Sequence, residues 1–260
     1  MRKNLRILTL MLLVFSTKLY SQAYVLPGFS FYEINQVSDF NSVKQNILDN
    51  NKVNINLSLD NEITEIPKDF FTGLNNIQML KISQKPLLQE DKGVRILPES
   101  ICELNRLNRL LIVGFPLVSL PKTIGKLSKL QYLGVINTNI TDLPKSIGNL
   151  SFLVALKLSN NNIKFLPESI GNLVSLVSLN IENNNLIGLP SSIDGLVFSL
   201  ANIAIGGNNI ISLSPMLLEM QLVGMLSING LGDQKIEVSF FRRVGRRIRF
   251  AFRKLFKRMG

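Results

Sequence analysis

The dipeptide Leu-Pro recurs at a fixed interval of 23 residues, and this period constrains the fold more than any other feature of the sequence. The five copies begin at Leu97, Leu120, Leu143, Leu166 and Leu189. A fixed period of this length is typical of solenoids, in which each repeat is one structural unit that packs against its neighbours. We therefore expect a stack of coils, because one coil alone cannot bury its apolar face.

One repeat shows what each coil should contain. Leu156 and Leu158 alternate with residues that can face solvent, which predicts a short strand with one buried face. Asn161 follows this strand, and Ile163 and Leu166 can point inward. A buried amide needs hydrogen-bond partners, so we expect this asparagine to satisfy backbone groups in the turn. The same position recurs in the next two repeats and predicts a structural ladder of Asn161, Asn184 and Asn208.

Other repeats depart from this pattern. Phe115 and Thr138 replace the ladder asparagine, so we expect their coils to close the turn differently. Degenerate repeats begin at Ile66 and Leu213, and the first of them contains an insertion around residues 85–94. Counting strand segments predicts about eight coils, with strands around Leu57, Leu80, Leu110, Leu133, Leu156, Leu179, Ile203 and Leu226.

The regular repeats read LPKSIGNLSFLVALKLSNNNI from Leu143 and LPESIGNLVSLVSLNIENNNL from Leu166. They resemble the leucine-rich repeat family in the 23-residue form that is common in bacterial and plant proteins. The resemblance covers about residues 53–231. It implies an α/β solenoid, a right-handed horseshoe whose parallel sheet lines the concave face. It also implies that partners bind on that face.

The two ends of the repeat domain, which we assign to residues 53–236, need caps that cover the first and last coils. Residues 24–52 form the predicted N-terminal cap, with a short helix over 38–50 and Ser38 as its N-cap. The apolar stripe of this helix comprises Phe40, Val43, Ile47 and Leu48.

Residues 1–23 are typical of a signal peptide. Arg2, Lys3 and Arg6 form a positive segment, an apolar run extends over 7–15, and Ser21-Gln22-Ala23 supplies small residues for cleavage. The apolar run is short for a membrane-spanning helix. We therefore expect export to the periplasm, the cell surface or the medium, with the bacterial envelope as the expected compartment. An uncleaved N-terminal membrane anchor is the alternative.

The net charge of +11 is concentrated at the ends of the chain. Residues 238–260 hold nine bases and no acid, whereas residues 24–237 hold 16 bases and 18 acids. On a helical projection of the tail, 237–260, the apolar side chains gather on one side. The other side holds Arg242, Arg243, Arg246, Arg247, Arg249, Arg253, Lys254, Lys257 and Arg258.

This pattern predicts a basic amphipathic C-terminal helix that binds an anionic membrane surface. Two alternatives stay open for the tail. It could bind an acidic polysaccharide or nucleic acid through charge alone. Of these two ligands, we expect the polysaccharide rather than nucleic acid. It could also simply cap the last coil, with its bases solvated.

The outward strand positions of the early coils are richer in apolar and basic residues than those of the later coils. An exposed apolar patch with an aromatic side chain and an arginine has the composition of a protein-binding hot spot. The alternative is that apolar residues accumulate there only because strands favour them. The predicted protein-binding residues are Met79, Lys81, Arg109, Leu111, Val113, Tyr132, Ile136 and Lys157.

The residue types argue against catalysis. The chain has no histidine and a single cysteine, Cys102, which removes histidine-based triads, internal disulfides and most metal sites. Cys102 stands where sister repeats have glycine and is interpreted as a small buried residue. Glu99 and Glu168 occupy equivalent repeat positions, so they are not a candidate acid–base pair. We expect no metal, cofactor or small-molecule substrate.

The sequence therefore predicts a non-enzymatic, exported protein that binds a protein partner on its concave face. The alternative is an envelope or membrane-surface protein. In that case the basic tail would bind anionic lipid or polysaccharide, and the solenoid would be a scaffold.

Overall fold

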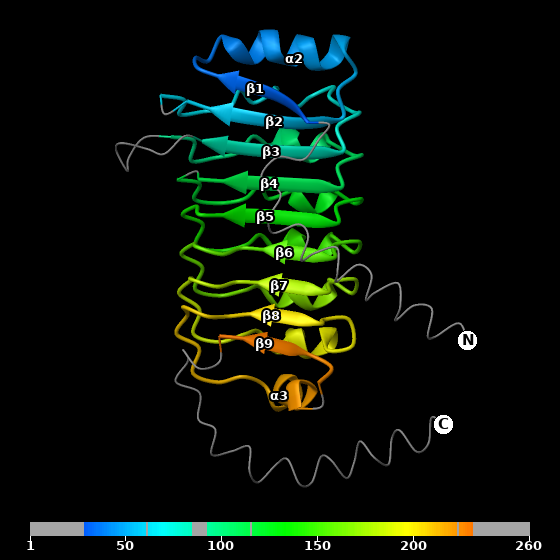
Figure 1. Cartoon of the computed structure of the whole chain (residues 1–260), viewed down its shortest axis with the longest axis vertical. Helices are drawn as coiled ribbons and strands as arrows, with labels where there is room; N and C mark the ends of the chain where they lie inside the picture. The colour runs from blue at the N-terminus through cyan, green and yellow to red at the C-terminus, as the bar shows by residue number, and fades with distance from the viewer. Residues whose placement is uncertain (1–28, 61, 85–92, 115, 223, 231–260) are drawn as a thin grey trace, which may run out of the picture.

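The computed structural model describes residues 29–60, 62–84, 93–114, 116–222 and 224–230. Within these ranges, nine parallel strands form one open sheet in chain order, from β1 to β9 (Figure 1). The strands are β1 (Ser30–Ile34), β2 (Asn54–Leu59), β3 (Met79–Gln84), β4 (Arg109–Val113), β5 (Tyr132–Ile136), β6 (Ala155–Lys157), β7 (Ser178–Asn180), β8 (Asn202–Ala204) and β9 (Ser227–Asn229). This arrangement confirms the predicted solenoid.

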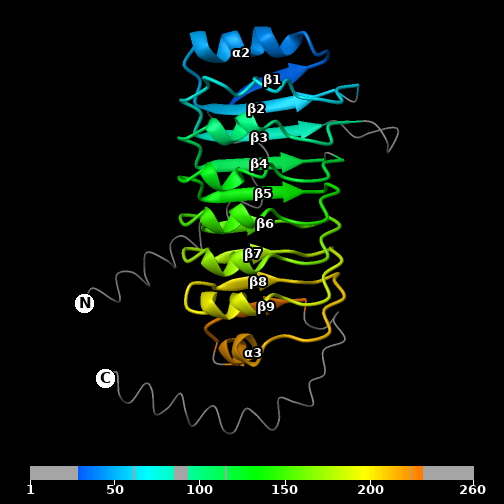
Figure 2. The same ribbon diagram turned by 180° about the vertical axis from the view of Figure 1, so that it is seen from behind.

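Short helices lie behind the sheet, one above another (Figure 2). Among the residues that the structure describes, four of the five 3₁₀ helices follow directly on a Leu-Pro pair, and their prolines have φ angles between −65° and −69°. The pyrrolidine ring fixes φ near this value, so proline sets the direction in which each coil turns away from the sheet. The 3₁₀ helices are η1 (Glu99–Glu103), η2 (Ile124–Lys126), η3 (Lys145–Asn149), η4 (Glu168–Asn172) and η5 (Ser191–Leu196).

The register of the sheet stacks equivalent leucines into a continuous core. Leu133 pairs with Leu156, and Leu156 pairs with Leu179. All three are fully buried. The eight predicted strands correspond to β2–β9, although Ile228 rather than Leu226 takes the inward strand position in the last of them, opposite Ile203.

The first strand, β1, was not predicted. It pairs in parallel with β2, and its Ile34 is fully buried opposite Leu59. The helix α2 (Asp39–Asp49) follows where the sequence predicted a capping helix. Phe40, Val43 and Ile47 are buried, but Leu48 is 44% exposed, so its predicted place in the apolar stripe is wrong.

The N-terminus of α2 is held differently from the expectation. Ser38 is the N-cap residue, but its side chain makes no capping hydrogen bond. The carboxylate of Asp39 instead accepts hydrogen bonds from the backbone N–H groups of Asn35 at 2.9 Å and Gln36 at 3.1 Å. It thereby ties the helix to the end of β1. At the other end of the stack, α3 (Pro215–Leu222) precedes β9.

The predicted signal peptide and basic tail, together with Phe115, lie outside the described residues. Those predictions stay predictions. Among the helices that the structure describes, none combines the length and the apolar character that a membrane crossing requires.

A buried asparagine amide connects each of several coils to the coil before it. The Nδ2 group of Asn161 donates to the carbonyl of Leu158 in its own coil and to that of Val135 in the preceding coil, both at 2.8 Å. Its Oδ1 accepts the backbone N–H of Thr138 at 3.1 Å. One side chain therefore closes its own turn and bonds to the backbone of the coil before it.

Asn184 and Asn208 repeat this arrangement. Asn184 donates to the carbonyls of Leu158 at 2.8 Å and Ile181 at 3.1 Å. Asn208 donates to those of Ile181 at 2.8 Å and Ile205 at 2.7 Å. The side-chain amides of the ladder therefore donate hydrogen bonds to the backbone across neighbouring coils.

Gln84 makes the same kind of side-chain-to-backbone hydrogen bonds in an early coil that has no ladder asparagine. Its Nε2 donates to the carbonyls of Asp60 at 3.0 Å and Ile63 at 2.9 Å, and its Oε1 accepts the N–H of Val94 at 3.2 Å. Sequence reasoning missed it because it lies outside the repeat pattern.

Behind the sheet, successive 3₁₀ helices approach very closely at a glycine. A Cβ atom at Gly125 would lie 2.2 Å from the carbonyl oxygen of Ser146, and one at Gly148 would lie 2.4 Å from that of Ser169. Such distances are impossible for a real side chain without a shift of backbone. Glycine is therefore required where these helices stack.

Two glutamates bond to the start of the following coil. Glu99 accepts hydrogen bonds from the backbone N–H of Lys122 at 2.9 Å and from both the N–H and the hydroxyl of Thr123. Glu168 accepts the N–H groups of Ser191 and Ser192. The hydroxyl of Thr123 chiefly lowers the pKa of Glu99, and the N–H of Ser192 chiefly lowers that of Glu168.

We expect Asn161→Ala to destabilise the protein by about 1–3 kcal/mol, because buried backbone groups lose their partners. Urea denaturation monitored by circular dichroism measures the change. Asn162→Ala is the matched control, because that side chain is exposed in the same turn. Equal destabilisation by the two substitutions would show that the buried amide has no special role.

The lowered pKa values also predict a pH dependence. A carboxyl group whose pKa is lower in the folded chain stabilises the fold above its unfolded pKa, about 4.3, and loses that effect as pH falls through the native value. The double variant Glu99→Gln/Glu168→Gln should therefore be less stable than wild type at pH 7. The deficit should shrink as the pH falls below about 4.

Urea midpoints between pH 7 and pH 3 test this, with the exposed Glu103→Gln as control. A deficit that stays constant over this range would contradict the assignment of these two carboxylates.

Candidate functional site

The outward face of the sheet brings the predicted protein-binding residues together. Outward and inward side chains alternate along β3 and β4, as the burial of every second residue shows. One row across the strands aligns Met79, Arg109, Tyr132 and Ala155; the next aligns Lys81, Leu111, Gly134 and Lys157; and a third pairs Val113 with Ile136. All eight predicted residues are half-buried and lie on β3–β6.

Two cations converge on the ring of Tyr132. The guanidinium carbon of Arg109 on β4 lies 4.3 Å from the ring centroid, and Nζ of Lys157 on β6 lies 6.0 Å from it. Both distances are within the range of cation–π attraction. The sequence predicted the three residues one by one, whereas the structure shows that they share one ring.

Gly134 forms the floor beneath this ring. A Cβ atom at this position would lie 2.7 Å from Cδ1 of Leu111 and 3.1 Å from Cε1 of Tyr132. The leucine methyl and the tyrosine ring therefore occupy the space that a side chain would fill. The sequence offered one signal for this role, since an isolated glycine in a strand often marks a close approach.

The centre of the outward face is basic. Across β3–β6, all of which the structure describes, the outward positions include Lys81, Arg109 and Lys157 and no acid. Burial, together with the nearby guanidinium of Arg109, lowers the pKa of Lys157 below its ordinary value. Outward acids occur on either side of this region, at Glu33 in β1 and at Glu182, two residues after β7 ends.

The later coils present smaller and more polar side chains on the same face. Ser178 and Asn180 on β7 pair with Asn202 and Ala204 on β8. Asn180 donates to the carboxylate of Glu182 at 2.9 Å. The outward positions of β7 and β8 hold neither a base nor a large apolar side chain, so the apolar and basic surface is confined to the early coils.

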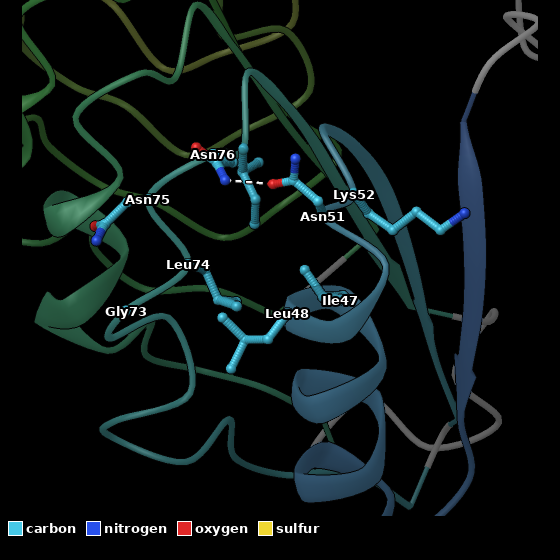
Figure 3. A pocket seen from close by; sticks show the side chains of 9 residues that line it. Ile47, Leu48, Asn51, Lys52, Gly73, Leu74, Asn75 and Asn76 are labelled. Carbon is cyan, nitrogen blue, oxygen red and sulfur yellow. Dashed lines mark hydrogen bonds between the residues drawn. The ribbon is translucent and has the colours of Figure 1, made fainter.

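A small pocket of about 160 Å³ lies where α2 meets the first coil (Figure 3). Its walls include Leu48 and Leu74, and the side chains of Asn51 and Asn76 are hydrogen-bonded to each other at its edge. Arg106 also donates to Asn76, at 3.0 Å. Ligand pockets usually enclose about 300–1,000 Å³. We therefore interpret this small pocket as a gap in the packing between the N-terminal cap and the first coil.

Cys102 is buried, and burial raises the pKa of its thiol. A thiol of this kind is a poor nucleophile, since the thiolate is the reactive form. Over the residues that the structure describes, no group of three or more histidine, cysteine, aspartate or glutamate side chains is placed to hold a metal ion.

Comparisons with known proteins agree with this architecture. Residues 119–209 match the family model described as a leucine-rich repeat region. No curated protein matches the chain. A leucine-rich repeat protein of Leptospira interrogans is similar in structure, with 28% identity and a TM-score of 0.60. The match covers 79% of this chain and 48% of that protein, so the chain spans about half the length of this relative.

Two more distant structures share the fold alone. One is the ectodomain of the plant membrane receptor kinase GASSHO1/SCHENGEN3 from Arabidopsis thaliana, with 23% identity, a TM-score of 0.57 and coverage of 71% of this chain and 22% of that one. The other is from the Toll–Spatzle complex of Drosophila, with 18% identity, a TM-score of 0.56 and coverage of 73% and 25%.

The 23-residue repeat, the open parallel sheet and the match over 119–209 all lead to the same classification. The chain is a leucine-rich repeat solenoid, and its residues 119–209 match the model of that family.

Proposed function

We propose that this protein is a non-enzymatic interaction module that binds a protein partner on the outward face of β3–β6. The observation that carries the proposal is the convergence of two cations on the Tyr132 ring. We name this surface the Tyr132 cluster and define it as Met79, Arg109, Leu111, Tyr132, Gly134 and Lys157. Aromatic and arginine side chains surrounded by apolar groups dominate the energetics of protein interfaces.

Relatives of the fold support a protein ligand. Leucine-rich repeat proteins generally mediate protein–protein interaction. The Arabidopsis ectodomain was solved in complex with CASPARIAN STRIP INTEGRITY FACTOR 2, and the Toll structure is a complex with Spatzle. For this chain we propose a protein partner on the sheet, and no catalytic activity, because we find no nucleophile paired with a base on the described surface.

We also propose that the protein acts outside the cytoplasm, in the bacterial envelope. The signal-peptide pattern of residues 1–23 supports export. The ectodomain among the similar structures is a further, weaker support.

We expect the double variant Arg109→Glu/Tyr132→Ala to weaken partner binding by at least about 30-fold, because hot-spot residues each contribute about 2 kcal/mol or more. Wild-type full-length chain and the variant serve as baits in parallel, and the dissociation constant is then measured for the proteins that only the wild type retains. Circular dichroism checks that the variant is folded.

The matched control is Asn180→Ala/Asn202→Ala, which changes two outward residues on β7 and β8. Equal losses for the two double variants would contradict a binding surface that is confined to the early coils.

A second proposal concerns the basic tail, because nine bases without an acid exceed what a cap requires. We expect the full chain to bind anionic vesicles and to lose this binding in a chain that ends at residue 237. Phe252→Ser/Leu255→Ser should also abolish it, because the apolar side chains must insert into the lipid interface. Vesicle flotation at two salt concentrations measures the effect.

Two other outcomes would replace the membrane proposal. Binding that tolerates the two serines and fails only without the arginines would indicate an acidic polysaccharide. Unchanged flotation together with a lower unfolding midpoint of the shortened chain would indicate a cap.

A further inference from the structure

We propose that the partner presents a short acidic peptide segment to the Tyr132 cluster, with one carboxylate held between Arg109 and Lys157 across the tyrosine ring. This inference rests on the proposed function and adds the chemistry of the partner.

The geometry gives the carboxylate its position. Arg109 comes from β4 and Lys157 from β6, and the ring between them belongs to β5. The two cations lie 4.3 Å and 6.0 Å from the same ring centroid. A carboxylate that approaches this ring can accept charge-assisted hydrogen bonds from cations placed in this way.

The electrostatics of the free protein favour the same ligand. Lys157 is half-buried, and the like charge of Arg109 disfavours its ammonium form, which lowers the pKa of Lys157. No outward residue of β3–β6 supplies a negative charge, over strands that are described in full. A carboxylate bound between the two cations relieves their repulsion, so binding should raise the pKa of Lys157.

The surroundings favour a peptide over a purely charged ligand. Leu111 and Met79 lie beside the cations, and Gly134 leaves a recess in which Tyr132 and Leu111 pack. A polysaccharide or phosphate offers no apolar side chains to cover this surface. Glu33 and Glu182 flank the basic region at its two ends along the stack. Because these carboxylates would repel further acidic groups, the acidic part of the ligand must be short. The basic run at 238–260 carries the wrong charge to occupy the site.

The test uses the full chain and fluorescein-labelled synthetic peptides of eight residues. In one peptide glutamate alternates with leucine and valine, and in its counterpart every glutamate is glutamine. We expect wild type to bind the glutamate peptide at least about tenfold more tightly, measured by fluorescence anisotropy at low salt, a difference of about 1.4 kcal/mol. Lys157→Glu should abolish this preference.

Two variants sharpen the result. Lys129→Glu makes the same charge change at an exposed site in the turn before β5 and should keep the preference. Gly134→Val leaves the net charge unchanged but displaces the Leu111 methyl and the Tyr132 ring, so it should weaken the binding of both peptides. Circular dichroism checks that each variant is folded, and titration of ¹³C-labelled lysine by NMR should show a higher pKa of Lys157 when the glutamate peptide is bound.

Several results would overturn the inference: no binding of the glutamate peptide, equal binding of the two peptides, the same loss with Lys129→Glu, or tighter binding of a sulfated polysaccharide than of either peptide. If Arg109→Glu/Tyr132→Ala still loses the captured partner in that case, the proposed function stands and only the acidic chemistry fails. If that double variant retains the partner, the proposed function fails as well.

Discussion

The fold depends on hydrogen bonds that buried side-chain amides make to the backbone of a neighbouring coil. Asn161, Asn184 and Asn208 each bond to carbonyl groups of their own coil and of the preceding one. A coil of 23 residues has too little core to stand alone, and its turn leaves backbone groups that water cannot reach. The buried amide both bonds to these backbone groups and links its coil to the preceding one. The stability of each coil therefore depends on the neighbouring coil.

The period predicted the fold because each inward position recurs in the same chemical setting. Leucines 23 residues apart had to stack, and the register of β5–β7 shows that they do. The repeat did not predict β1, because the five residues of this strand precede the first repeat and do not share its sequence pattern. The role of Gln84 was not predicted for a related reason. Its side chain is longer than that of asparagine and bonds to the same kind of backbone groups from one residue before the ladder position. No other repeat has an equivalent residue that would have indicated this role.

Strand alternation was enough to predict which side chains face outward, but not how they meet. Arg109, Tyr132 and Lys157 lie in different repeats, and their approach depends on rotamers that a one-dimensional pattern does not encode. Gly134 supplies the missing constraint, because the ring can lie along the strand only where no Cβ atom stands beneath it. The proposed binding surface thus depends on the missing side chain of Gly134 as much as on the residues that surround it.

The glycines behind the sheet have a mechanical consequence for the same surface. Hydrogen bonding fixes the separation of neighbouring strands at about 4.8 Å. The distance between the 3₁₀ helices behind the strands can vary. The ratio of this helix–helix distance to the strand–strand distance sets the curvature of a solenoid. Gly125 and Gly148 keep the back of the stack narrow, since a Cβ atom there would wedge neighbouring coils apart. Each glycine therefore limits the distance between neighbouring coils at the back of the stack, and a larger residue at these positions would bend the outward face of the sheet inward.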